Sequence, residues 1–231
     1  MTEWNLIGGI VPPLNFNDWT VLFNKYKQTP EFIFKNSDMN LSEFKFIFFW
    51  EYFHRIWGRL IGLTFFIPLI YFWIKKKLNG KEKKFYLILT CIGIFQAFMG
   101  WFMVESGLAD NPDVSHFRLS AHLTTAFIIY TFLVFSFWNN LDKKTAFDRS
   151  VTNQKIKNHS KRVTLSIIFL IITVSTGAFV SGTNAGWAYN NFPLMGDNFL
   201  PPIILEGQNL ALVNIFNDIG FIQFFHRILA T

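Results

Sequence analysis

Residues 46–74 read FIFFWEYFHRIWGRLIGLTFFIPLIYFWI, an apolar run that contains three charged side chains and one histidine. A helix of about 20 residues is enough to cross the hydrocarbon core of a bilayer. The run is longer than that, so it predicts a transmembrane helix that carries ionisable groups near its beginning.

Three further apolar runs, at 85–104, 119–138 and 163–181, are also long enough to cross a bilayer. A fifth begins near Asp218 and reaches Thr231. Hydrophobic residues make up 51% of the 231 residues and charged residues 16%, which excludes a disordered chain. Cys91 is the only cysteine, which excludes a disulfide scaffold. We therefore predict an all-α, multi-span membrane helix bundle.

Lysine and arginine predict the orientation of the spans, because cytoplasmic loops of membrane proteins are enriched in both. Thirteen of the 21 basic residues lie in the short loops 75–84 and 142–162. The connectors 105–117 and 183–217 contain no basic residue, so they are expected to face outward. This distribution also explains the net charge of +6 without a nucleic-acid partner.

The chain divides into four predicted regions. Residues 1–45 are rich in aromatic side chains and are expected to form a folded, outward-facing cap at the membrane interface. Residues 46–138 form an N-terminal half-bundle of three spans, and 139–162 a basic cytoplasmic loop. Residues 163–231 begin a second half with one span, an outer loop and a partial span. We expect the chain to be an internal fragment of a longer one.

An internal repeat supports the division into two halves. The tetrapeptide FHRI occurs at 53–56 and again at 225–228, and each copy follows a loop with glycine and Pro-Pro, at 6–13 and 194–202. Repeated halves are common in membrane proteins. The copies differ three residues before the histidine, where the first has Glu51 and the second Gln223.

His54 and His122 are predicted to lie at the same depth. Each precedes the first cytoplasmic lysine of its span by 21 residues, so both lie about 31 Å above the inner surface. Ionisable groups inside a membrane are costly and usually functional. The two imidazoles are either separate hydrogen-bonded histidines or paired axial ligands of one heme iron. Small residues on the same faces, Gly58, Gly62 and Ala126, leave room for a macrocycle but also suit helix packing.

Charged groups near the outer ends of the spans have two interpretations each. Glu51 shares a helix face with His54, where it is a candidate catalytic carboxylate or a salt-bridge partner of Arg55. The arginines are candidates for heme propionate contacts or for snorkelling to lipid headgroups. They are Arg55, Arg59, Arg118 and Arg227.

Six motifs are distributed along the chain: MTEWNLIGG at 1–9, EYFHRIWGR at 51–59, GWFMVESG at 100–107, VSHFRLSAHL at 114–123, GTNAGW at 182–187 and FHR at 225–227. Together they resemble the heme A synthase family, in its alphaproteobacterial and mitochondrial branch. The resemblance covers essentially the whole chain, and the motifs EYFHR and RLSAHL are quite specific.

The resemblance implies two pseudo-symmetric four-helix halves, the second truncated here, and oxidation of the C8 methyl of heme O to the formyl of heme A. It implies His54 and His122 as axial ligands of the substrate heme and Glu51 as the catalytic carboxylate. It implies that His226 binds a heme b cofactor whose second ligand lies beyond Thr231. Some family members carry a cysteine pair in the first outer loop, which this chain lacks.

The implied partners are heme O, membrane lipid, heme O synthase and cytochrome oxidase assembly factors. A bacterial cell membrane is favoured over a mitochondrial inner membrane because the loops are compact. Two rival functions stay open. One is a bis-histidine cytochrome b-type electron carrier that modifies no heme, and the other is a repeat-built transporter with a His and Glu proton relay.

Overall fold

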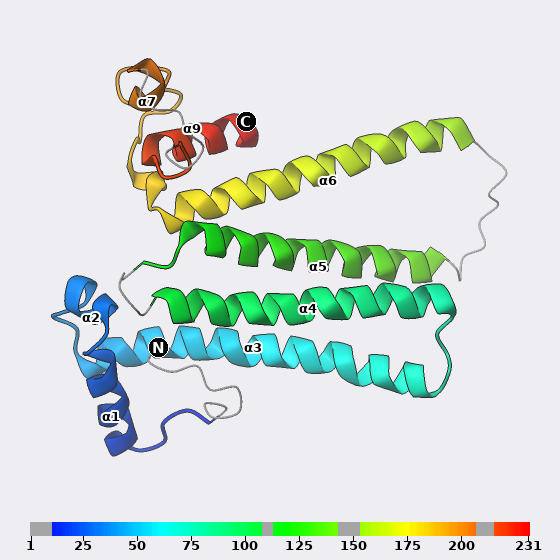
Figure 1. Ribbon diagram of the computed structural model, residues 1–231, viewed down its shortest axis with the longest axis horizontal. Helices are drawn as coiled ribbons and strands as arrows, with labels where there is room; N and C mark the ends of the chain where they lie inside the picture. The colour runs from blue at the N-terminus through cyan, green and yellow to red at the C-terminus, as the bar shows by residue number, and fades with distance from the viewer. Residues whose placement is uncertain (1–10, 108–112, 143–152, 207–214) are drawn as a thin grey trace. The chain divides into compact units, whose positions relative to one another are not determined.

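The computed structural model describes residues 11–107, 113–142, 153–206 and 215–231. Regular structure in these ranges is helical apart from one isolated β-bridge between Met195 and Asn198, which confirms the predicted all-α class. The chain forms two compact units, residues 1–114 and 115–231. The helices, labelled in Figure 1, are α1 Phe16–Tyr26, α2 Pro30–Lys35, α3 Leu41–Ile74, α4 Gly80–Gly107, α5 His116–Asp142, α6 Asn153–Gly182, the 3₁₀ helix η1 Ala185–Trp187, α7 Pro202–Leu205 and α9 Ile219–Ala230.

Four helical segments are long and apolar enough to cross a membrane, namely Leu41–Ile74, Gly80–Val104, His116–Asn140 and Lys161–Gly182. They coincide with the four predicted runs, so the multi-span prediction is confirmed. At most 11% of each apolar window is buried, which leaves large apolar surfaces for lipid. The predicted partial span is also helical, as α9.

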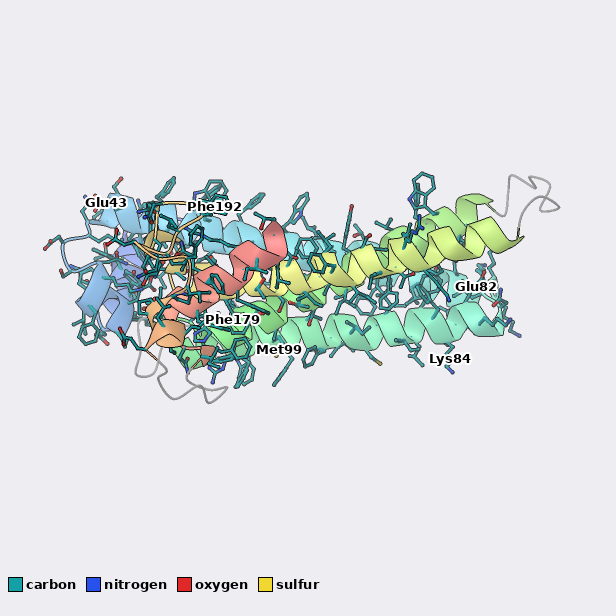
Figure 2. All side chains as sticks on the ribbon, turned by 90° about the horizontal axis from the view of Figure 1, so that it is seen from above. Glu43, Glu82, Lys84, Met99, Phe179 and Phe192 are labelled. Carbon is teal, nitrogen blue, oxygen red and sulfur yellow. The ribbon has the colours of Figure 1, made fainter. Side chains whose placement is uncertain are left out.

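Local capping sets where the two long helices of the first unit begin. Asn40 accepts from the backbone N–H groups of Ser42 and Glu43, and the Glu43 carboxylate accepts from the Asn40 N–H, which closes a capping box. Asn79 and Glu82 make the same reciprocal bonds before α4. These polar caps precede the apolar runs, so α3 begins at Leu41 rather than at residue 46. Figure 2 shows Glu82 and Lys84 at the starting end of α4 and Met99 towards its other end.

The two short N-terminal helices pack on the first turns of α3 through an aromatic cluster. Phe23, Tyr26, Phe44 and Phe48 are all buried. The rings of Phe23 and Tyr26 lie 5.1 and 5.0 Å from that of Phe44, the spacing of favourable aromatic pairs. Burial raises the pKa of the Tyr26 hydroxyl, while its bond from Asn36 acts in the opposite direction. Residues 16–35 therefore form a folded unit with the start of α3, and their placement as an outward-facing cap at the membrane interface stays a prediction.

In the second unit, α5 and α6 run antiparallel. They lie closest where α5 begins and α6 ends (Figure 1). The buried Ser120 hydroxyl donates to the Ser175 carbonyl at 3.0 Å and lies 2.8 Å from the Ser175 hydroxyl. A Cβ at Gly182 would lie 2.9 Å from the Cβ of His116, so only glycine permits this close approach of the two helices. These contacts join α5 to the last turns of α6.

Parts of the predicted features lie outside the described residues, and the grouping of the first three spans into one half-bundle stays a prediction. The ranges concerned are 1–10, which hold the first sequence motif and most of the first repeat loop, 108–112 in the first outer connector, 143–152 in the basic loop and 207–214 in the second outer connector.

The aromatic cluster predicts that the cap depends on Phe44. Replacing Phe44 with alanine is expected to lower the free energy of unfolding of the cap by about 3–5 kcal/mol, because it leaves a cavity between three rings. Thermal unfolding and protease cleavage within residues 16–35 measure the effect. Phe46→Ala is the matched control, since Phe46 on the same helix is 66% exposed. Equal cleavage of both variants would contradict the assigned core.

Candidate functional site

Glu51, His54 and Arg55 lie within one turn of α3. Glu51 Oε2 and Arg55 Nη2 are 3.9 Å apart, a loose ion pair between residues four apart in sequence. The salt-bridge interpretation of Glu51 is thus present in the structure. It does not remove the catalytic interpretation, because a carboxylate held one turn from an imidazole can still accept a proton.

The two histidines predicted to share a heme belong to different units. His54 lies on α3 and is exposed, whereas His122 lies on α5 and is half-buried. Their pairing stays a prediction. The same holds for the propionate role of Arg59 on α3 and Arg118 on α5.

The FHRI motif of the second repeat copy lies in α9. Asp218 caps α9 by accepting from the Phe221 N–H at 2.6 Å, which agrees with the predicted start of the helix. Gln223 and Arg227 then lie one turn apart and both donate to the carbonyl oxygen of Tyr189, at 2.9 and 2.5 Å. Helix α9 therefore contacts the preceding loop at an acceptor that two of its side chains share.

Gln223 is 5% exposed and uses its amide nitrogen on a second carbonyl, that of Gly186, at 3.3 Å. Carbonyl oxygens only accept, so the side chain at this position must donate. A carboxylate cannot do so. The two repeat copies differ at this position, Glu51 against Gln223. The need for a donor to two carbonyl oxygens explains the glutamine of the second copy.

Arg227 makes further contacts with the repeat loop at 194–202. Its Nη1 donates to the Leu194 carbonyl at 2.9 Å and contacts the Met195 sulfur at 3.4 Å. The guanidinium also lies 5.8 Å from the centre of the Phe192 ring, which is labelled in Figure 2. Gly196 adopts φ +77°, where a residue with a Cβ is disfavoured, and its carbonyl accepts from Asn191 at 2.5 Å. The arginine thus fastens the loop, and its propionate role stays a prediction.

His226 packs on α6. Its Nδ1 lies 2.9 Å from the Thr176 hydroxyl, and a Cβ added to Gly177 would lie 3.1 Å from its Cε1. One turn further along α9, the Leu229 carbonyl accepts from Thr173 at 3.3 Å. Sequence reasoning missed Thr176, Gly177 and Tyr189. The small residues at 173, 176 and 177 recur at helical spacing and were the available signal.

His116 lies against a backbone carbonyl and two aromatic rings. Its Nε2 lies 3.1 Å from the Phe216 carbonyl oxygen, and its ring lies 4.3 Å from Phe117 and 5.3 Å from Phe179. Within the described ranges, no group of three or more His, Cys, Asp or Glu side chains could hold a metal ion.

The helices and their ionisable residues define a multi-span helical membrane protein with single imidazoles on or beside its spans. Over residues 1–231 the chain matches the COX15-CtaA model, cytochrome oxidase assembly protein, and it belongs to this family. The predicted family resemblance is confirmed.

Curated relatives cover the whole chain. The heme A synthase of Flavobacterium johnsoniae is 42% identical and aligns with 100% of this chain and 67% of its own length. That of Nitrosospira multiformis is 43% identical, over 100% of this chain and 64% of its own length. That of Rickettsia canadensis is 42% identical, over 99% and 66%. The chain thus spans about two thirds of their length, and no solved structure matches it.

The hydrogen bonds from Gln223 to the Gly186 and Tyr189 carbonyl oxygens predict that glutamate cannot replace this glutamine without loss of stability. In Gln223→Glu two donors are lost and a carboxylate faces two carbonyl oxygens, which is expected to cost at least about 1–3 kcal/mol. Thermal unfolding and protease cleavage at residues 185–201 measure the loss. Gln28→Glu, at an exposed glutamine, is the control and should resemble the wild type. A Gln223→Glu protein as stable as the control would refute the role of this amide.

Proposed function

We propose that the full-length protein is a heme A synthase, an oxidoreductase that converts the C8 methyl of heme O to the formyl group of heme A. The observation that carries the proposal is the identity of 42–46% to the heme A synthases of two Flavobacterium species over the whole chain. Conversion of a methyl to a formyl group adds one oxygen atom and, with water as its source, releases four electrons and four protons, so the site needs water, a base and an electron acceptor.

The substrate heme is assigned to His54 and His122. The equal predicted depth of the two imidazoles on outside-to-inside helices supports this, as does the match of their motifs to the family. Heme O is apolar, so it can reach exposed His54 from the bilayer. Arg55, Arg59 and Arg118 are the candidate partners for its propionates, since guanidinium binds carboxylate in bidentate fashion.

Glu51 is assigned as the base. It lies one turn before His54 on α3, and its carboxylate lies 3.9 Å from the Arg55 guanidinium, a nearby cation that favours the charged form of the base. A positioned carboxylate that accepts a proton in the transition state contributes about 10²–10⁴-fold to a rate. The second copy has no carboxylate at this position, and its Gln223 amide donates to the carbonyl oxygens of Gly186 and Tyr189.

The surroundings of His226 fit one axial position of a heme b. The imidazole is held by a hydroxyl at Nδ1, which leaves Nε2 as the nitrogen that could bind iron. Heme b, when bound, supplies a one-electron relay. Arg227 and Gln223 keep the outer loop in place above this histidine.

The remaining assignments follow from the charge pattern and the family. We place the histidines near the outer face of a bacterial cell membrane, with loops 75–84 and 142–162 in the cytoplasm. Heme O synthase is the expected donor of substrate, and cytochrome oxidase assembly factors are the expected recipients of product.

Chromatography of extracted hemes tests the reaction. Full-length protein co-expressed with a heme O source is expected to contain heme A or hydroxylated heme O besides heme b. Heme b alone, with heme O available, would instead identify the cytochrome b-type electron carrier. Absence of any heme would favour the transporter.

Replacing Glu51 with glutamine is expected to leave heme O binding intact and to lower heme A formation by roughly 10²-fold or more, because the amide cannot accept the proton. Product analysis and total heme content measure the two effects. Asp197→Asn, an exposed carboxylate in the outer loop, is the control and should not change either. Normal product from Glu51→Gln would remove this residue from the mechanism.

Ligand replacements should separate the two hemes. His54→Ala and His122→Ala are each expected to abolish binding of heme O and leave heme b, whereas His226→Ala should abolish heme b. Optical spectra and heme extraction of the purified variants provide the measurement. Loss of the same heme in all three variants would show that the assignment to two sites is wrong.

A further inference from the structure

Thr176 is the polar side chain that contacts the His226 imidazole, and it lies on a different helix. Its Oγ1 is 2.9 Å from His226 Nδ1 and also 2.9 Å from the carbonyl oxygen of Thr173, one turn back on α6. Both contacts have ordinary hydrogen-bond lengths. The hydroxyl therefore connects a backbone carbonyl to the ring.

The direction of these two bonds follows from counting hydrogens. A threonine hydroxyl has one hydrogen to donate, and a carbonyl oxygen can only accept. The contact to Thr173 therefore uses the hydroxyl hydrogen. The contact to His226 must then be made by a hydrogen on Nδ1, which the hydroxyl oxygen accepts. Both bonds exist together only when the neutral ring carries its hydrogen on Nδ1.

The packing of α9 on α6 keeps the ring at this hydroxyl. Gly177 leaves space for the imidazole, since a Cβ there would lie 3.1 Å from Cε1 and 3.6 Å from Nε2. The Thr173 hydroxyl lies 2.9 Å from the Phe169 carbonyl oxygen of its own helix and 3.3 Å from the Leu229 carbonyl oxygen, so its single hydrogen is shared and the next turn of α9 packs on the same face of α6. The ring thus meets two successive positions of α6, Thr176 and Gly177, while Thr173 meets the next turn of α9.

We propose that Thr176 is a positioning residue that holds His226 in the Nδ1–H tautomer, so that the Nε2 lone pair is free to bind a heme iron. The metal-binding part rests on the proposed function of His226 as a heme b ligand. A hydrogen bond from the far ring nitrogen fixes the orientation of a ligating imidazole and raises its basicity, and its loss typically weakens metal binding by about 10–100-fold.

The tautomer is tested without heme. The ¹⁵N spectrum of histidine-labelled, heme-free full-length protein is recorded at about pH 8, above the ordinary histidine pKa of roughly 6.5. The His226 signals are identified by their absence in His226→Asn. We expect a protonated Nδ1 and an unprotonated Nε2. The reverse pattern in the wild type would overturn the proposal, and this measurement needs no Thr176 variant to fold.

Variants then test whether the hydroxyl is the cause. Thr176→Val removes it at constant shape and is expected to produce a mixture of tautomers, while Thr176→Ser should restore the wild-type pattern. Thr173→Val is the matched control, because it removes a hydroxyl that contacts α9 at Leu229 and not at His226. A pure Nδ1–H tautomer in Thr176→Val would overturn the role of this residue.

Heme readouts separate this inference from the proposed function. In Thr176→Val, heme b retention should fall about tenfold or more, and the reduction potential of the remaining heme should rise, because a less basic imidazole stabilises ferric iron less. If His226→Ala retains heme b, the ligand assignment fails while the tautomer result stands. If His226→Ala loses heme b but Thr176→Val matches the wild type in both readouts, the positioning role fails alone.

Discussion

Backbone groups without a hydrogen-bond partner are too costly to leave in a membrane, and this constraint shapes the described spans and their ends. The spans meet it internally as helices. Their first turns need added acceptors, which Asn40, Asn79 and Asp218 provide. Between α6 and α9, the carbonyl oxygens of Gly186, Tyr189 and Leu194 accept hydrogen bonds from two side chains of α9, Gln223 and Arg227. This part of the loop and the helix are therefore one folded element.

The same constraint gives the repeat its asymmetry. In the second copy, residues 223 and 227 must both be donors, because they face carbonyl oxygens. In the first copy, position 51 is an acceptor beside Arg55. A helix pair built from one pattern thus supports the loop in one half and leaves a carboxylate next to an imidazole in the other. Under the proposed function, the reactive role of Glu51 and the supporting role of Gln223 occupy the same position of the two copies.

Most of the fold follows from the amino-acid pattern, because apolar length alone identifies a membrane-spanning helix. The four spans and the start of α9 at Asp218 could be predicted for this reason. The ends of helices follow less directly from apolar length. Helix α3 begins at Leu41, because a capping box made of polar residues lies outside the apolar run. His226 could be named from its motif. Its neighbours Thr176 and Gly177 could not, because their importance arises only when α9 packs on α6, 50 residues away for the Thr176 contact.

The contacts of α6 are unevenly distributed along its length. Those with α5 and α9 involve Thr173, Ser175, Thr176, Gly177 and Gly182, all in the last turns, while residues 161–170 are exposed. Apolar substitutions should therefore accumulate freely in the first part of the span, where lipid accepts any side chain of similar polarity. The contact positions of the last turns have no such freedom, since each of them meets a side chain or backbone group of a neighbouring helix. Over evolutionary time this one helix should change at two very different rates.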